Sequence, residues 1–229
     1  MHLHEFLSHV HDVVKPKVYL EVGVQHGTSL KLAHAAESAY GIDPNPLILP
    51  AGNQTIFPQT SDTYFWNVRK QEDATGDVHP RIDLGFIDGL HHFEQALRDF
   101  LNIEHWSHDG TVVVFDDVLP RNQEEAQRDQ IPGDWTGDVW KVTQVLLRYR
   151  PELVIWEVNT QPTGTLLVWG FGEEEKNIHY YDLLRQAIEE YTELTVVPDN
   201  VINRAFAVEP VFALNELKEC IDARDVDQE

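Results

Sequence analysis

The feature that most constrains the fold of this chain is the stretch of residues 17–43. It opens with a short apolar run at residues 17–22, typical of a buried strand, and continues into a loop with two glycines. A helix is expected over residues 28–38, and a second strand over residues 39–43 that ends in an acid. A strand, a glycine loop, a helix and a second strand make a βαβ unit, which predicts a parallel sheet.

The two glycines, Gly23 and Gly27, let the chain turn and let a ligand approach the backbone. Their G-x-x-x-G spacing differs from the G-x-G-x-x-G of dinucleotide folds, which disfavours a pyrophosphate at the helix N-terminus. Asp43 follows the second strand, about 20 residues downstream, where an acid binds both ribose hydroxyls. Together these features favour a cofactor that contains a nucleoside. A glycine turn with a helix-capping aspartate is the purely structural alternative.

Residues 82–92 form a second candidate site. They begin as a buried-looking strand, break at a glycine, and present Asp88, His91 and His92 ahead of an apolar-periodic helix. Open α/β sheets bind ligands at the carboxyl ends of their strands. An imidazole has the unperturbed pKa needed to accept a hydroxyl proton near neutral pH. We therefore predict that His91 is a general base, with His92 as its competitor and helix capping as the alternative role.

Residues 111–115 are rich in β-branched side chains and predict another strand, which stops at Asp116 and Asp117. Neighbouring strands lie about 4.8 Å apart, so these carboxylates and Asp88 can converge on one ion. Carboxylates without cysteine favour a hard cation such as Mg²⁺. The predicted metal ligands are Asp88, Asp116 and Asp117. The alternative is that Asp88 and Asp117 position the cofactor and cap helices without a metal.

A family resemblance joins the two sites. The runs EVGVQHGTS (21–29) and GIDP (41–44) resemble the opening of class I S-adenosylmethionine-dependent methyltransferases. The runs FIDGLH (86–91) and VFDD (114–117), with Asp99 between them, resemble the metal-dependent small-molecule O-methyltransferases, which include macrolide-sugar methyltransferases and a relative from cephamycin biosynthesis. The resemblance covers about residues 17–170. It implies a Rossmann-like α/β fold with about seven mostly parallel strands, helices on both faces and a partly antiparallel last hairpin.

Matched by position, the resemblance also implies roles for single residues. In the related enzymes the three metal positions are Asp, Glu and Asp, so Asp116 here is shorter by one methylene. His91 matches the position of the general base. A helix N-cap is the alternative role for Asp62. The residues implied to hold S-adenosylmethionine are Glu21, Gly23, Gly27 and Ser29 at its methionine end, Asp43 at the ribose, Asp62 near the adenine, and Asp88.

The expected activity is methyl transfer from S-adenosylmethionine, assisted by Mg²⁺, to an oxygen of a small polyhydroxylated acceptor. One alternative is a metal-independent methyltransferase. A second is a nicotinamide-linked Rossmann oxidoreductase, against which the G-x-x-x-G spacing speaks. A third is a nucleoside-binding module without catalysis.

Composition narrows the partners. The formal charge of −22 argues against nucleic acid and anionic membranes, because phosphate contacts need basic patches. No apolar run reaches the roughly 20 residues of a membrane span. One cysteine excludes an internal disulfide, and the N-terminus shows no secretory signal, so a cytoplasmic location is expected. The acidity fits either a high-salt cytoplasm or an ordinary acidic surface, and a homo-oligomer is left open.

The absence of a linker or repeat predicts one domain over residues 1–229. It has an N-terminal helix within residues 1–16, a candidate lid at 119–141 and C-terminal helical additions at 172–229. The lid's composition suggests that Trp135, Trp140 and Arg121 shape an acceptor pocket, or that the tryptophans pack the lid, and that Lys141 pairs with an acid of the site. Surface or capping roles are expected for His2, His4, His9 and His11.

Overall fold

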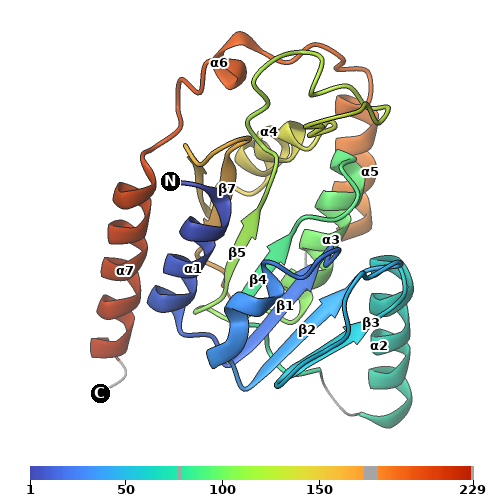
Figure 1. Ribbon diagram of the computed structural model, residues 1–229, viewed down its shortest axis with the longest axis vertical. Helices are drawn as coiled ribbons and strands as arrows, with labels where there is room; N and C mark the ends of the chain where they lie inside the picture. The colour runs from blue at the N-terminus through green and yellow to red at the C-terminus, as the bar shows by residue number, and fades with distance from the viewer. Residues whose placement is uncertain (77–78, 173–179, 228–229) are drawn as a thin grey trace.

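A seven-stranded sheet is the centre of the computed structural model, which describes residues 1–76, 79–172 and 180–227. The strand order is β3-β2-β1-β4-β5-β7-β6 (Figure 1). Pairing is parallel from β3 to β5, and β7 is antiparallel to both β5 and β6. This confirms the predicted mostly parallel sheet with an antiparallel last hairpin. The strands are β1 (Val18–Val22), β2 (Ser38–Ile42), β3 (Gln54–Phe57), β4 (Leu84–Ile87), β5 (Val112–Phe115), β6 (Val154–Val158) and β7 (Thr165–Trp169).

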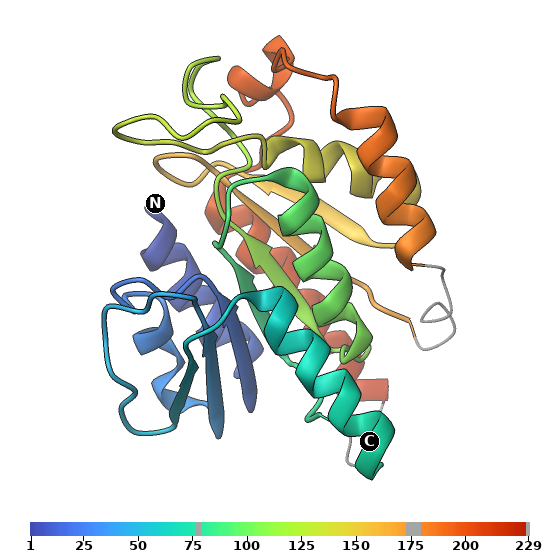
Figure 2. The same cartoon turned by 90° about the vertical axis from the view of Figure 1, so that its right-hand side faces the viewer.

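Helices cover both faces of this sheet, as predicted. On one face α1, η1 and α7 share a core with the sheet, and on the other face α2, α3, α4 and α5 do so (Figures 1 and 2). Among the described residues, no helix has the length and apolar character needed to cross a membrane. The helices are α1 (Leu3–Val14), the 3₁₀ helix η1 (Leu30–Ala35), α2 (Ser61–Thr75), α3 (Phe93–His105), α4 (Trp140–Tyr149), α5 (Tyr180–Tyr191), α6 (Asp199–Ile202) and α7 (Pro210–Asp227).

The central strands β4 and β5 are buried on both faces, which explains their continuous apolar sequences. Successive side chains alternate between the two layers: Phe86 packs in the layer of α1, and Ile87 packs in the layer of α3. Every residue of these two strands is buried. Their carboxyl ends are therefore held firmly where Asp88 and the pair Asp116 and Asp117 leave the sheet.

One helix prediction needs correction. The helix expected over residues 28–38 is only the 3₁₀ helix η1, because Ala33 leaves helical geometry and Ala36 is already extended, ready for β2. Helix α2 begins at Ser61, after the N-cap Thr60, and runs to Thr75. The short helix α6 was not anticipated.

Candidate functional site

A cavity of about 870 Å³ opens at the carboxyl edge of the sheet, where β1, β2, β4 and β5 end. Loops from these strands line it, together with the start of α2, the β6–β7 turn and residues 119–139, called the covering segment below. Of the predicted site residues, Glu21 and Gly27 are not part of the described cavity wall. The others line it: Gly23, Ser29, Asp43, Asp62, Asp88, His91, Asp116 and Asp117.

The loop after β1 is held by the carboxylate of Asp43. Its Oδ2 accepts hydrogen bonds from the backbone N–H groups of Val24 and Gln25, at 2.9 and 2.8 Å. Its Oδ1 accepts one from the N–H of Asn45, at 2.7 Å. Asp43 thus shapes the glycine loop and also lines the cavity.

Gly23 brings the two walls of the cavity into contact. Its φ is +92°, and a Cβ built on it would lie 1.8 Å from the backbone oxygen of Asp88. Gly27 has a φ of +63°, and a Cβ there would lie 2.1 Å from a methyl carbon of Ile48. Gly23 requires glycine, because its backbone conformation is unfavourable for other residues and the close atom belongs to the backbone of Asp88. At Gly27 the left-handed backbone favours glycine, and the close atom is the end of the flexible Ile48 side chain.

Glu21 is fully buried behind Ser29. Its Oε1 accepts a hydrogen bond from the Ser29 hydroxyl at 2.8 Å, and its Oε2 accepts one from the Tyr19 hydroxyl at 2.6 Å. Burial raises the pKa of Glu21 to about 8, although these two hydrogen bonds oppose the rise. Glu21 therefore reaches the cavity only through Ser29, which lines it.

Asp62 lies in the first turn of α2 with its side chain half-exposed. Its carboxylate pairs with Arg98 at 2.8 Å and accepts a hydrogen bond from the Gln95 amide at 3.3 Å. The N-cap of α2 is Thr60. Asp62 is therefore a cavity residue and not the cap of this helix.

Asp88, His91 and Asp117 form a compact acid–imidazole cluster on the β4–β5 side. The Nε2 atom of His91 lies 3.5 Å from Asp88 Oδ1, and Nδ1 lies 3.2 Å from Asp117 Oδ2. One ligand atom from each residue lies within 4.8 Å of the other two. Asp117 has a φ of +63°, a left-handed conformation that is uncommon for a residue other than glycine and is often found at functional sites.

The ring of His91 also contacts Trp135. The two rings stack with centroids 5.0 Å apart and planes at 18°. The Nδ1 atom of His91 lies 2.7 Å from the Trp135 carbonyl oxygen. A carbonyl oxygen can only accept a hydrogen bond, so we infer that Nδ1 carries the hydrogen. In the neutral ring, Nε2 is then the atom that accepts a proton.

The two aspartates set the charge of His91. Burial lowers the pKa of His91, but the hydrogen bond to Asp88, the charges of Asp117 and Asp88, and the Trp135 carbonyl together raise it to about 9. Burial raises the pKa of Asp117 to about 6, against the lowering effect of His91. At neutral pH the ring is therefore an imidazolium that faces these acids.

Asp116 stands apart from this cluster. It lines the cavity, but it is not one of the three residues whose ligand atoms converge. Burial raises the pKa of Asp116 well above its usual range, and the charges of Asp117 and Asp88 add to the rise. Of the predicted metal ligands, the structure thus brings Asp88 and Asp117 together with His91, and leaves Asp116 at the side.

Residues 20–118 match a protein family described as a methyltransferase domain. This confirms the resemblance to S-adenosylmethionine-dependent methyltransferases read from the sequence. No curated protein matches the chain.

Solved structures share the fold at low sequence identity. An O-methyltransferase from Bacillus cereus in complex with SAH is 13% identical, with a TM-score of 0.52, over 72% of this chain and 78% of that chain. The O-methyltransferase TomG from Streptomyces achromogenes, involved in tomaymycin synthesis and solved with SAM, is 17% identical, with a TM-score of 0.54, over 74% and 79%. The SAH-bound methyltransferase PaMTH1 from Podospora anserina is 14% identical, with a TM-score of 0.52, over 73% and 77%. These similarities confirm the predicted class I methyltransferase fold.

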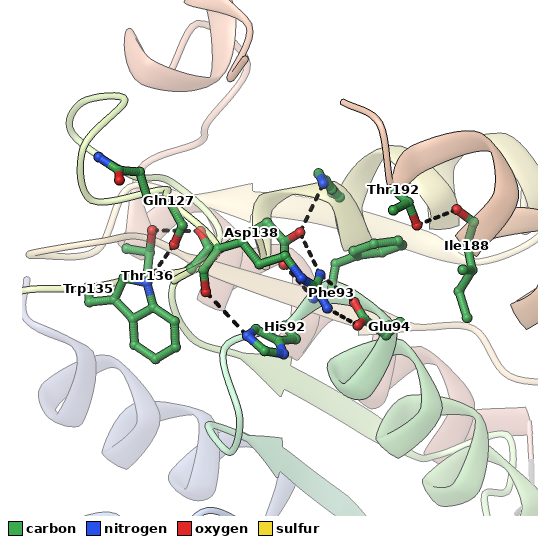
Figure 3. Close-up of polar contacts among 12 residues, drawn as sticks. His92, Phe93, Glu94, Gln127, Trp135, Thr136, Asp138, Ile188 and Thr192 are labelled. Carbon is green, nitrogen blue, oxygen red and sulfur yellow. Dashed lines mark hydrogen bonds and ion pairs between the residues drawn. The ribbon is translucent and has the colours of Figure 1, made fainter. Parts of the chain in front are cut away.

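The covering segment is held in place by hydrogen bonds and ion pairs within it. The indole Nε1 of Trp135 donates to the Gln127 carbonyl oxygen at 2.6 Å (Figure 3). Arg121 pairs with Glu125 and with Asp134. Of the four residues singled out in the candidate lid at 119–141, Trp135 alone lines the described cavity.

Three expectations about this part of the chain are corrected. Arg121 does not line the described cavity wall, because Glu125 and Asp134 hold its guanidinium. Trp140 is buried in the core, which is the packing role given as its alternative. Lys141 pairs with Asp138 at 2.9 Å and not with an acid of the predicted site.

Some cavity residues carry no signal in the sequence. The side chain of Thr163, in the β6–β7 turn, hydrogen-bonds Asp117. The turn lies next to α1, since the Leu3 N–H donates to the Gln161 carbonyl oxygen at 3.1 Å. His4 is exposed, as expected of a surface residue, and it also lines the cavity from α1. His11 is buried, so the surface or capping role expected of it is wrong. In the sequence only Gly164 marks this turn. The contact between Thr163 and Asp117 joins residues far apart in the chain, so no local pattern predicts it.

Proposed function

We propose that this methyltransferase transfers the methyl group of S-adenosylmethionine to a hydroxyl oxygen of a small polyhydroxylated acceptor, with the help of a divalent cation such as Mg²⁺. The observation that carries the proposal is the acid–imidazole cluster, which meets the glycine loop where Gly23 contacts Asp88. Oxygen as the receiving atom is supported by the proteins of similar fold from B. cereus and S. achromogenes, both called O-methyltransferases.

The cavity fits S-adenosylmethionine. Its volume of about 870 Å³ is within the range of roughly 300–1,000 Å³ for small-molecule sites. Gly23 lets a ligand approach the backbone closely. When bound, S-adenosylmethionine supplies a methyl group on a cationic sulfur. The residues proposed to hold it are Glu21, Gly23, Gly27, Ser29 and Asp88 at the methionine end, Asp43 at the ribose and Asp62 near the adenine.

The acid–imidazole cluster fits a divalent cation. Its donors are two carboxylates and an imidazole, with ligand atoms within 4.8 Å of one another. We propose Asp88 and Asp117 as the first ligands, with Asp116 as the third position expected from the sequence. When bound, the cation lowers the pKa of an acceptor hydroxyl.

His91 is the proposed general base. With Nδ1 against the Trp135 carbonyl, Nε2 is the atom left to take the proton of the acceptor hydroxyl. This requires a neutral ring, whereas burial and the aspartates together leave the pKa of His91 at about 9. Asp88 and Asp117 are also the proposed cation ligands. Neutralising them removes the charge that keeps the proton on the ring.

The acceptor is proposed to be neutral or cationic. Among the described residues that line the cavity there are six aspartates and no lysine or arginine. A carboxylate or phosphate on the acceptor would face these six carboxylates without a lysine or arginine to pair with, and the net charge of −22 would repel it on approach. The same charge supports a free small molecule over nucleic acid or an anionic membrane, and the single cysteine supports a reducing cytoplasm.

Calorimetry with S-adenosylmethionine and with NAD, each in Mg²⁺ and in EDTA, tests the cofactor. We expect binding of S-adenosylmethionine and none of NAD. Binding of NAD without S-adenosylmethionine would favour the nicotinamide-linked alternative and contradict the proposal.

Acceptor charge is tested with three probes that share one pair of adjacent hydroxyls: catechol, cationic dopamine and anionic 3,4-dihydroxybenzoate. We expect a clearly lower kcat/KM for the anionic probe than for the other two. Equal kcat/KM values for all three would contradict the inference from the lining charges.

A further inference from the structure

Asp138 is buried where the covering segment meets the turn that carries His91 (Figure 3). Its Oδ1 atom accepts a hydrogen bond from the backbone N–H of Phe93 at 2.9 Å. Its own backbone N–H donates to the carbonyl oxygen of His91 at 3.2 Å. Asp138 therefore holds the chain on both sides of His92, and with it the turn that presents the His91 ring.

Helix α3 takes its cap from this remote residue. The N-cap residue His92 makes no side-chain cap hydrogen bond, and its Nε2 atom lies 3.2 Å from the Arg128 carbonyl oxygen. The carboxylate of Asp138 supplies the acceptor for the first helical N–H from 45 positions along the chain. A local cap would only stabilise the helix. A remote cap also fixes where the helix begins relative to the covering segment.

Two cations allow a charged carboxylate in this buried place. Oδ2 of Asp138 lies 2.9 Å from the Lys141 Nζ and 3.1 Å from an Arg128 nitrogen. Asp138 is 3% exposed and Lys141 2% exposed, so each charge depends on the other. Arg128 also pairs with Glu94 in the first turn of α3. Lys141, which was expected to pair with an acid of the site, pairs with Asp138 instead.

The residues just before Asp138 complete the contact. Gly137 has a φ of +55°, and a Cβ built on it would lie 1.8 Å from the His91 carbonyl oxygen. The Trp135 carbonyl meets the His91 Nδ1 at 2.7 Å. The run 135–138 thus packs along the backbone and the ring of His91.

We propose that Asp138 is a positioning residue for methyl transfer. Through its bond to the Phe93 N–H, it sets the His91 ring against Trp135 and between Asp88 and Asp117. Asp138 does not line the described cavity wall, so it acts through His91. The effect on rate rests on the proposed function, whereas the placement of the ring does not.

The test removes the acceptor without leaving a buried lone charge. The double variant Asp138→Ala, Lys141→Met loses the cap and the ion pair together. The double variant Asp138→Asn, Lys141→Met also loses the ion pair but keeps an oxygen for the Phe93 N–H. The matched control is Glu104→Gln, which breaks the buried pair of Glu104 with Arg150 at the other end of α3.

The first readout is the NMR signal of the His91 Nδ1–H proton, identified by its loss in His91→Gln. Its hydrogen bond to the Trp135 carbonyl slows exchange with water and keeps it visible. We expect the signal in the wild type, in Glu104→Gln and in the asparagine double variant, and its loss in the folded alanine double variant. A persistent signal in that folded variant, or its loss in Glu104→Gln as well, would overturn the proposal.

The second readout is kcat with catechol as the probe, beside the affinity for S-adenosylhomocysteine. We expect a drop in kcat of about 10- to 100-fold in the alanine double variant, with affinity nearly unchanged and kcat rescued by asparagine. Loss of the signal without a drop in kcat would mean that His91 is not the base, and would reject the rate effect. Absence of turnover in every protein would count against the proposed function, while the signal still decides the placement.

Discussion

The two walls of the cavity are built in different ways. The β1–β2 wall comes from one βαβ unit, and its main polar contact joins Asp43 to the N–H groups of Val24 and Gln25, 19 and 18 positions away. The β4–β5 wall joins strands from the middle of the sheet to the covering segment. There His91 meets the carbonyl of Trp135, 44 positions away. The β1–β2 wall is therefore a local motif, whereas the β4–β5 wall is made by segments that are far apart in the sequence.

The two walls also differ in what balances the charges of their side chains. In the β1–β2 wall, Asp43 is satisfied by backbone N–H groups, so the loop keeps its shape without any ligand. In the β4–β5 wall, His91, Asp88 and Asp117 balance one another's charge. The first wall is therefore suited to binding, and the second is suited to a change of charge during reaction.

The largest expected effect is on turnover in the β4–β5 wall. His91→Gln should lower kcat by about 10²- to 10⁴-fold, because the acceptor loses its base, while affinity for S-adenosylhomocysteine stays nearly constant. Initial rates with catechol and calorimetry measure the two quantities. His92→Gln is the matched control and should be nearly neutral. If His91→Gln instead abolishes Mg²⁺ binding, His91 is a ligand and not the base.

The next effect separates two neighbouring acids of the same wall. Asp117→Asn should weaken Mg²⁺ binding by about 10- to 100-fold, because a carboxylate of the cluster becomes a neutral amide. Asp116→Asn should weaken it less, since Asp116 lies outside the cluster. Mn²⁺ titration followed by electron paramagnetic resonance compares the variants. The reverse order would make Asp116 a direct ligand, as the sequence predicted.

In the β1–β2 wall, a pH-dependent effect is expected from Glu21. Its folded pKa of about 8 lies above its ordinary 4.5, so the folded state holds a proton that the unfolded state releases. Stability from this group is present below pH 4.5 and is lost as the pH rises through about 8. Glu21→Gln should therefore match the wild type in acid and exceed it at pH 9, by the order of a few kcal/mol. Urea unfolding at both pH values measures the gap. If the difference in unfolding free energy between Glu21→Gln and the wild type narrows as the pH rises, the raised pKa of Glu21 is not its cause.

The smallest of these effects is expected where the walls touch. Gly23→Ala should cost about 1–3 kcal/mol of stability and weaken binding of S-adenosylhomocysteine, because the new Cβ would push Asp88 away. The control is Gly52→Ala, which also has a positive φ but has nothing within 4 Å of its Cβ. Thermal unfolding and calorimetry compare the two variants. Equal losses of stability in Gly23→Ala and Gly52→Ala would show that the contact of Gly23 with Asp88 does not join the two walls.

The same contrast explains what could be predicted from the sequence. The parallel sheet, its strands and the acid after β2 follow from local periodicity and glycine placement, and the structure has them. The cover over His91 was expected only as a lid, because nothing local in residues 119–139 shows that Asp138 caps α3 or that Trp135 meets His91. Lys141 was given the wrong partner for the same reason, since nothing local shows that it pairs with Asp138. Partners of buried charges are chosen by the whole fold and not by their neighbours in the chain.

In the proposed reaction, a base and a cation in the β4–β5 wall activate the acceptor hydroxyl, and the β1–β2 wall holds the methyl donor. The most direct test of this proposal is the transfer of a labelled methyl group from S-adenosylmethionine to catechol, measured in Mg²⁺ and in EDTA. We expect a singly O-methylated product together with S-adenosylhomocysteine in Mg²⁺, and strong suppression of the transfer in EDTA. Equal rates in the two conditions would contradict the cation, and binding of S-adenosylmethionine without transfer to any of the three acceptor probes would contradict the proposed reaction.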